Sequence, residues 1–207
     1  MEGVAIRTRV AVLGTVAELH EEPIPSSLAF LEQLVERLGP DLLCADIRPD
    51  HWERGDLSAA AVEYRKALVP LAERTNIVIV PVCGATAYDW TTPRTGQLRG
   101  LRATLVRWMN AAIGTLERLA GTPGAVNTGL LGRFCDLVGA VGVRLGDGAT
   151  RQQWEEANQE LVDNILQAVR RDPGRRVLVT VDCRRRSSLQ QRLSQAPEVE
   201  LVDFRNL

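Results

Sequence analysis

Two aspartates in this 207-residue sequence follow apolar segments that have the composition of buried strands. Asp46 ends the segment DLLCAD (41–46), and Asp182 follows VLVTV (177–181). If the two segments are neighbouring strands of a parallel sheet, both carboxylates face one crevice at the carboxyl ends of the strands, where open α/β sheets bind ligands. Paired carboxylates there could transfer a proton or hold a cation. A helix cap or a salt bridge between Asp46 and Arg48 is an equally good interpretation of Asp46.

The loop after the first apolar segment holds a histidine among acidic residues. His20 follows Glu18 and precedes two further glutamates. Because imidazole titrates near neutral pH, His20 could act as a general base, with Glu18 or Asp46 orienting its ring. A surface histidine in an acidic loop is the alternative.

Three arginines follow Asp182 after a single cysteine, and Ser187 then opens the next predicted helix. An arginine beside a helix N-terminus is a good site for phosphate, sulfate or carboxylate. Three consecutive arginines are not expected all to point inward, so one of Arg184 or Arg185 is predicted to hold an anionic group of a substrate, together with Arg48. The alternative is a solvated run of charge.

Aromatic residues and one further aspartate are candidates for contacts with an organic ligand. Tyr88, Asp89 and Trp90 lie in a long irregular segment (83–96) that follows the predicted strand IVIVPV (77–82). Loops of this length in compact domains are usually functional or disordered, and these residue types favour function. Tyr64 is a weaker candidate, because simple packing explains it slightly better.

Composition and missing motifs exclude several classes of protein. The formal charge of −1 gives no positive field for nonspecific nucleic-acid binding, so no nucleic-acid partner is expected. No run approaches the roughly 18 apolar residues of a membrane span, and the N-terminus enters a strand without a signal-peptide pattern, so a cytoplasmic location is expected. The four cysteines form no CxxC pair, which predicts buried apolar side chains and no metal site. The glycine-rich stretches lack the P-loop lysine, there is no Gly-x-Ser-x-Gly elbow, and no cofactor is predicted.

The elements that must position these residues alternate between strands and helices. Apolar runs predict strands at 10–13, 41–46, 77–82, 177–181 and 199–202, and helical spacing predicts helices at 25–38, 56–74, 98–119, 130–138, 151–171 and 187–193. This alternation predicts an α/β fold with a mainly parallel sheet of about five strands and flanking helices. We expect a single domain over 1–207, with a helical insertion or lid at about 90–168 between the third and fourth strands.

Short motifs spread over most of the chain occur in the order in which a known superfamily carries them. They are LGT (13–15), PD (40–41), CADIR (44–48), YR (64–65), PLA (70–72), IVIVPV (77–82), Asn158, NI (164–165) and VLVTVDCRRRSSLQQRL (177–193). Together they resemble the erythromycin esterase/ChaN-like superfamily, and in particular its TraB/Tiki branch. Members of that superfamily include metal-dependent proteases, esterases and a haem-binding lipoprotein.

The histidine motifs of that superfamily are altered in this chain. A Gly-x-x-His follows the first strand in the family, whereas Ala17 stands at the histidine position here and His20 lies three residues further on. Asp46 occupies the acidic position after the second strand, with Arg48 at a nearby basic one. The second Gly-x-x-His is replaced by the four residues at 182–185. The resemblance therefore implies the fold more strongly than the activity.

These observations predict a metal-independent enzyme that acts on a small organic substrate with an anionic group. Asp46, Asp182, Glu18 and His20 would handle protons in a hydrolysis, elimination or cyclisation, and bacterial specialised metabolism is the expected setting. The alternative is a non-catalytic subunit derived from a TraB/Tiki-like hydrolase, which binds a ligand or stabilises a partner as a homo-oligomer or in a complex with another enzyme. That alternative predicts an exposed apolar patch of a few hundred Å².

Overall fold

A parallel sheet of five strands lies at the centre of the computed structural model, which describes residues 7–16, 25–84, 101–120 and 123–207. The strands are β1 (Thr8–Thr15), β2 (Leu42–Ala45), β3 (Val78–Pro81), β4 (Val177–Asp182) and β5 (Val199–Leu201), and their order in the sheet is β3-β2-β4-β1-β5. All pairs are parallel, so the carboxyl ends of the strands lie at one edge. The predicted α/β fold is confirmed.

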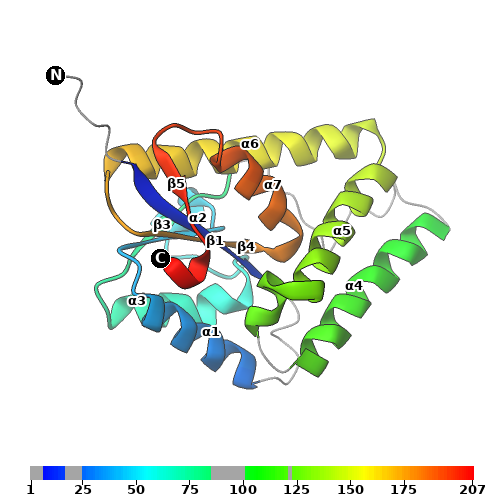
Figure 1. Cartoon of the computed structure of the whole chain (residues 1–207), viewed down its shortest axis with the longest axis horizontal. Coiled ribbons are helices and arrows are strands. Elements are labelled where there is room, and N and C mark those ends of the chain that lie inside the picture. Colours follow the sequence, from blue (N-terminus) through cyan, green and yellow to red (C-terminus); the bar gives the residue numbers. More distant parts are fainter. Residues whose placement is uncertain (1–6, 17–24, 85–100, 121–122) are drawn as a thin grey trace.

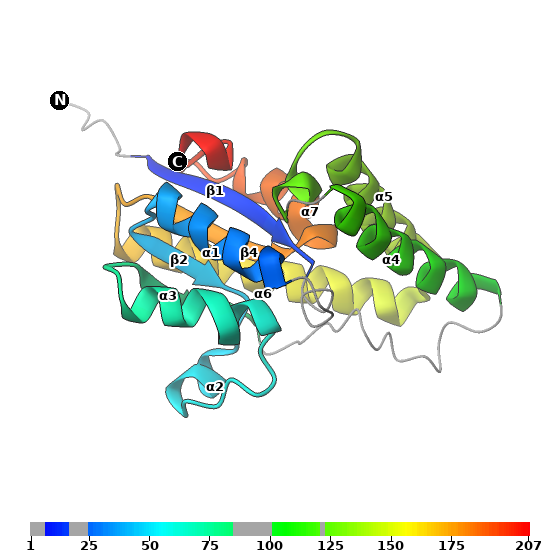
Figure 2. The ribbon, with the colours of Figure 1, turned by 90° about the horizontal axis from the view of Figure 1, so that it is seen from below.

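Helices cover both faces of the sheet (Figure 1 and Figure 2). One face packs against α1 (Pro25–Leu38), the π-helix η2 (Tyr64–Leu68) and α3 (Val69–Glu73), with a core that includes Leu13, Leu43 and Leu68. The other face packs against α6 (Gly148–Arg171) and α7 (Cys183–Leu193), with a core that includes Val179, Ile165 and Leu189. Because both faces are buried, the central strands are almost continuously apolar.

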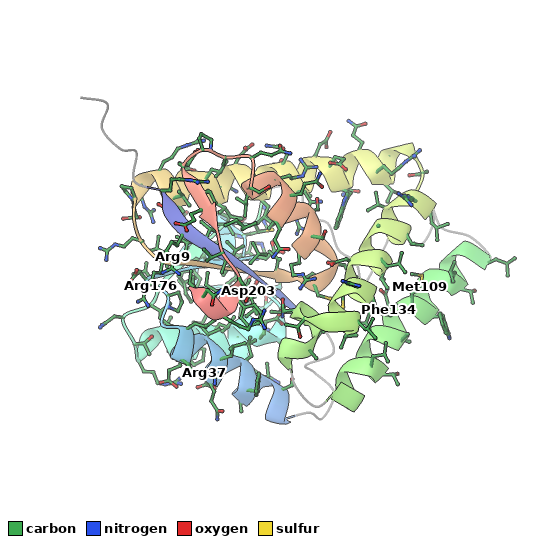
Figure 3. All side chains as sticks on the ribbon, viewed as in Figure 1. Arg9, Arg37, Met109, Phe134, Arg176 and Asp203 are labelled. Carbon is green, nitrogen blue, oxygen red and sulfur yellow. The ribbon has the colours of Figure 1, made fainter. Side chains whose placement is uncertain are left out.

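The insertion between β3 and β4 extends the molecule beyond the carboxyl ends of the strands (Figure 1). It comprises α4 (Leu101–Ala120), the short helix η3 (Pro123–Asn127), α5 (Gly129–Leu145) and α6. Met109 of α4 and Phe134 of α5 lie between these two helices (Figure 3), in a small core that joins the insertion to Val16 and Cys183. None of the described helices is both long and apolar enough to cross a membrane.

Three helix predictions were wrong at their boundaries. The predicted helix 56–74 becomes helical only at residue 62, because Asp56 binds the backbone and hydroxyl of Ser58 in a turn and does not cap the helix. The predicted helix 130–138 is part of the 17-residue α5. The last predicted helix begins at Cys183, since Asp182 caps it by accepting the backbone N–H of Arg184 at 2.8 Å. Two further short helices are α2 (Pro49–Glu53) and η4 (Phe204–Asn206).

Candidate functional site

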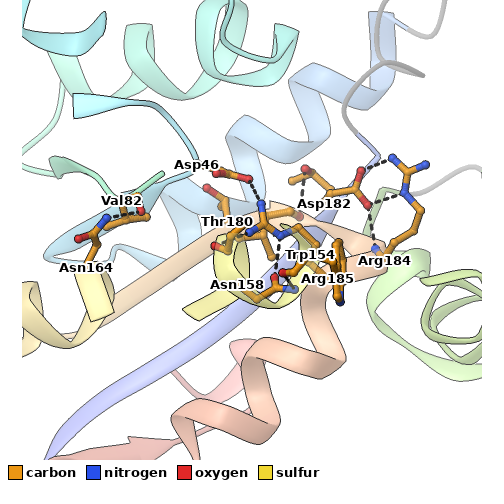
Figure 4. Close-up of polar contacts among 12 residues, drawn as sticks. Asp46, Val82, Trp154, Asn158, Asn164, Thr180, Asp182, Arg184 and Arg185 are labelled. Atoms are coloured by element: carbon orange, nitrogen blue, oxygen red, sulfur yellow. Dashed lines mark hydrogen bonds and ion pairs between the residues drawn. The ribbon is translucent and has the colours of Figure 1, made fainter. Parts of the chain in front are cut away.

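The carboxyl edge of the sheet brings Asp46 and Asp182 together, as expected for neighbouring strands. β2 pairs with β4 through Ala45 and Thr180. Asp46 follows Ala45 directly and Asp182 comes two residues after Thr180, so both aspartates lie at this edge. On the other side of β4, Asp182 is in register with Thr15, the last residue of β1. Figure 4 shows that each aspartate faces an arginine from the start of α7. The edge is therefore rich in paired charges.

Asp46 forms a buried ion pair with Arg185. Arg185 is 4% exposed, and its Nη1 lies 3.0 Å from Asp46 Oδ2. It also donates to Asn158 Oδ1 at 2.9 Å and to the Ala157 carbonyl at 3.2 Å, and it lies 5.7 Å from the centre of the Trp154 ring (Figure 4). The alternative interpretation of Asp46, a salt bridge with Arg48, does not hold, because Arg48 pairs with Asp50 at the surface.

Asp182 holds the second arginine, Arg184, in a two-point contact. Its Oδ1 accepts Arg184 Nε at 2.8 Å, and its Oδ2 pairs with Nη2. The remaining terminal nitrogen, Nη1, donates to Asn110 Oδ1 of α4 at 2.9 Å. Arg184 therefore connects the end of β4 to the helical insertion.

The expectation that only one arginine points inward was wrong. Arg184, Arg185 and Arg186 are only 9%, 4% and 8% exposed. The side chains of successive residues in a helix point in directions about 100° apart. The first turn of α7 is surrounded by α5 and by the carboxyl ends of the strands. Each arginine therefore reaches a different carboxylate, and Arg186 forms an ion pair with Asp136 of α5 at 2.8 Å. The anionic partners of all three arginines thus come from the chain itself.

Glu63 is a buried carboxyl group at this edge that the sequence did not single out. It is 1% exposed, and its Oε1 accepts the Thr15 hydroxyl at 2.7 Å. Within the described residues its Oε2 is buried without a hydrogen-bond partner. Burial, with a smaller contribution from the charges of Asp182 and Asp46, raises the pKa of Glu63 to about 7 against the effect of the Thr15 hydrogen bond. Glu63 therefore holds its proton to a higher pH than an exposed glutamate does.

Tyr64 uses its hydroxyl to hold the strand ends together. The hydroxyl donates to the Thr180 carbonyl at 2.8 Å and accepts the Asp46 backbone N–H at 3.0 Å. Burial, with the charges of Asp46 and Glu63, raises the pKa of Tyr64 well above its usual value. These contacts match the packing interpretation of Tyr64, whose hydroxyl holds the backbone of Asp46 in place.

A pocket of about 170 Å³ opens beside these groups, between the strand ends and α4. It is lined by Val16, Asn110, Ala111, Ile113, Asp182, Cys183 and Arg184. Val16 follows Thr15, whose hydroxyl binds Glu63, so two consecutive residues of the chain connect Glu63 to the pocket lining. A hydrogen bond with Cys135, together with burial, raises the pKa of Cys183 well above its usual value, so Cys183 lines the pocket as a neutral thiol.

Asparagines from the insertion fix the strand ends around this pocket. Asn127 of η3 accepts the Gly14 N–H at 2.6 Å and donates to the Gly14 carbonyl at 2.8 Å, as a neighbouring strand would. Asn164 of α6 donates to the Val82 carbonyl at 3.1 Å (Figure 4). Gly14 has no room for a side chain, because a Cβ there would lie 2.8 Å from Cys183 Cα.

The other predicted site residues are placed apart from this pocket or are not described. Arg48 is directed to Asp50 in a partly exposed pair. Glu18, His20, Tyr88, Asp89 and Trp90 lie outside the residues that the structure describes. Among the described residues there is no group of three or more His, Cys, Asp or Glu side chains that could hold a metal ion.

One sequence signal could have found Glu63. It shares a helix face with Ala67 and Leu71, four and eight residues further on, and both are buried. A carboxyl group on an otherwise apolar face is costly and is often retained for function. Thr15 and Asn110 carry no comparable signal, because their roles depend on partners far away in the chain.

We compared the chain with protein-family models, with curated proteins and with solved structures, and none of the three comparisons finds a match. Membership of the erythromycin esterase/ChaN-like superfamily therefore stays a prediction.

Proposed function

We propose that this protein is an enzyme that binds a small organic molecule in the pocket at the carboxyl edge of the sheet and transfers a proton through Glu63. The observation that carries the proposal is the state of Glu63: a fully buried carboxyl group with one unpartnered oxygen and a pKa of about 7. A group poised near the working pH is an effective general acid or base. An apolar residue at position 63 would serve the fold better, which favours a functional reason for the carboxyl group.

The contacts of Thr15 suit both protonation states of Glu63. With Glu63 ionised, the Thr15 hydroxyl donates to Oε1 at 2.7 Å. With Glu63 protonated, the same hydroxyl can direct its hydrogen to the Val181 carbonyl, 3.3 Å away, and accept a hydrogen bond from the carboxylic acid. The Thr15 hydroxyl can therefore hydrogen-bond to Glu63 in both protonation states. This chemistry suits hydrolysis of an ester or amide, an elimination or a cyclisation.

A panel of chromogenic nitrophenyl esters and nitroanilides with acyl groups of increasing length tests the proposal. We expect turnover of at least one member, with a rate that changes around a midpoint of about pH 7. Glu63→Gln should lower that rate by about 10² to 10⁴-fold, the usual contribution of a positioned acid or base. Glu73→Gln, an exposed glutamate on the neighbouring α3, is the matched control and should leave the rate unchanged. Equal rates for wild type and Glu63→Gln would contradict the proposal.

A second function, association through the insertion, is favoured by the surface of α4. The helix buries Met109 and Ile113 on one face, yet exposes an apolar stripe on another. The stripe consists of Leu101, Leu105, Trp108 and Leu116, which are 89%, 44%, 66% and 41% exposed. An exposed apolar face of this kind is typical of an interface. If the stripe joins two copies, light scattering should show a dimer that Trp108→Glu converts to a monomer. A wild-type monomer at every concentration would contradict self-association.

A further inference from the structure

The polar side of the pocket consists of Asp182, Arg184 and Asn110, and their hydrogen bonds decide which ligand atoms can be recognised. Arg184 and Asp182 neutralise each other through their two-point contact. A ligand carboxylate would meet the negative Asp182, and a ligand ammonium would meet the positive Arg184. The ion pair therefore favours a neutral ligand over the anionic substrate that the arginine run predicts.

The amide of Asn110 is fixed in one orientation. A guanidinium carries only donors, so the Asn110 oxygen must face Arg184 Nη1, which lies 2.9 Å away. The NH₂ group of Asn110 then points away from Arg184, and in the described part of the chain it has no acceptor. Asn110 thus offers the pocket a donor whose position is set by the ion pair.

The guanidinium that holds Asn110 also holds a hydrogen-bond acceptor at the pocket. Asp182 lines the pocket, its side chain is 13% exposed, and its Oδ2 binds the same guanidinium, through Nη2, that holds Asn110 through Nη1. A donor and an acceptor that line one pocket suit a ligand with both a carbonyl oxygen and an N–H. Val16, Ala111 and Ile113 supply apolar walls around this polar side.

We propose that the pocket binds neutral molecules in which an amide, as a carboxamide or a lactam, is attached to a short apolar body, with Asn110 donating to the carbonyl and Asp182 accepting the N–H. The volume of about 170 Å³ is similar to that of a cavity of about 150 Å³ that binds benzene, which limits the body to a small ring or chain. This inference rests on the proposed function in that it names the substrate class of the same pocket.

Caprolactam is a suitable probe, with two rings of the same size as comparators. Cycloheptanone keeps the acceptor and lacks the N–H, and azepane is a cation without an acceptor. Cyclohexanecarboxylate serves as the anion. In proton–nitrogen NMR titrations of the full chain, caprolactam should shift the signals of Asn110, Ile113 and Cys183. Cycloheptanone should bind about tenfold more weakly, because the acceptor at Asp182 then has no N–H partner. The two charged probes should bind more weakly still.

The variant Asn110→Asp keeps the size of the side chain and removes its donor. It can still accept from Arg184, so the fold is expected to survive, and the dispersion of its NMR spectrum checks this. Caprolactam should bind this variant at least about tenfold more weakly. Thr115→Val, an exposed position further along α4, should leave the affinity unchanged. Unchanged affinity in Asn110→Asp, equal affinity for the ketone and the lactam, or tighter binding of the anion would each overturn the inference.

Binding and catalysis fail separately in this design. Caprolactam binding is read from the Asn110 signal without turnover, so it does not depend on the proton transfer assigned to Glu63. Selective lactam binding without turnover would leave the ligand class standing and remove the catalytic proposal. Turnover on the ester panel without selective lactam binding would leave the catalytic proposal standing and remove the ligand class.

Discussion

Replacing Asp46 with asparagine should destabilise the fold, because it leaves the charge of Arg185 buried without a carboxylate. Arg185 is 4% exposed, and the remaining contacts of its guanidinium would be two neutral acceptors, Asn158 Oδ1 and the Ala157 carbonyl, with the Trp154 ring nearby. The substitution barely changes the shape of the side chain, so the effect is one of charge.

The expected loss is about 3 kcal/mol of unfolding free energy. Breaking one side of a buried ion pair costs about 3 to 5 kcal/mol. The lower end applies here, because asparagine keeps an oxygen that can accept from Arg185 and the Asp46 side chain is 19% exposed. The double variant with Arg185→Met removes both charges. It should be more stable than the sum of the two single losses predicts, by about 1 to 3 kcal/mol.

Urea unfolding followed by circular dichroism measures these losses. With a slope of about 1 to 3 kcal/mol per molar urea, Asp46→Asn should lower the midpoint by at least about 1 M. Asp50→Asn removes the corresponding carboxylate from the exposed pair with Arg48 and should change the midpoint far less. Equal small effects of the two substitutions, or strict additivity in the double variant, would refute the reasoning. A loss of activity in Asp46→Asn should then be attributed to the fold before the chemistry.

Three further predictions follow from other contacts. The pKa of Glu63 is raised from 4.5 to about 7 in the folded protein, so between these values the folded state binds more protons than the unfolded state and the unfolding free energy falls as pH rises. At about 1.4 kcal/mol per pH unit, the unfolding free energy should fall by about 3 kcal/mol over this range. In urea unfolding at the same pH values, the Glu63→Gln variant should not show this fall. The same pH dependence in the variant and the wild type would count against a buried charge at Glu63. Asn127→Ala removes both hydrogen bonds to Gly14 and should cost about 2 kcal/mol in urea unfolding, and a loss below about 0.5 kcal/mol would disagree with those bonds. Gly139→Ala would place a Cβ 2.2 Å from a carbonyl oxygen of α7 and should lower the unfolding free energy by about 3 kcal/mol. At Gly148 a Cβ would meet nothing within 4 Å, so Gly148→Ala should be neutral or stabilising. Similar melting temperatures for the two variants would contradict the close approach of α5 and α7.

The fold could be predicted from the sequence because its signals are local. Each strand is a short apolar run, as at 177–181, and burial on both faces removes the alternation that would suggest another sheet type. The placement of Asp46 and Asp182 at one edge followed from the same runs, because parallel strands end together. Helix boundaries were less predictable. Asp56 has the residue type of a cap, but its choice of Ser58 as a partner depends on the surrounding turn.

The arrangement within the site depends on contacts between residues far apart in the chain. Glu63 belongs to the site because its carboxyl group accepts a hydrogen bond from Thr15. Asn110 belongs to it because it accepts a hydrogen bond from Arg184, which lies 74 residues away in the sequence. The arginine run showed the difficulty most clearly. Sequence alone suggested one buried arginine and a ligand anion, whereas α5 and the strand ends provide a carboxylate for each of the three.

The central claim is that Glu63 is a buried carboxyl group that exchanges its proton near neutral pH beside the pocket. Carboxyl-carbon NMR of the isotopically labelled protein, titrated from acid to alkaline pH and assigned with Glu63→Gln, measures this directly. The account predicts a midpoint of about 7 for the Glu63 signal. A midpoint near 4.5, the ordinary value for a glutamate, would show that the group is solvated or fully paired and would contradict the account.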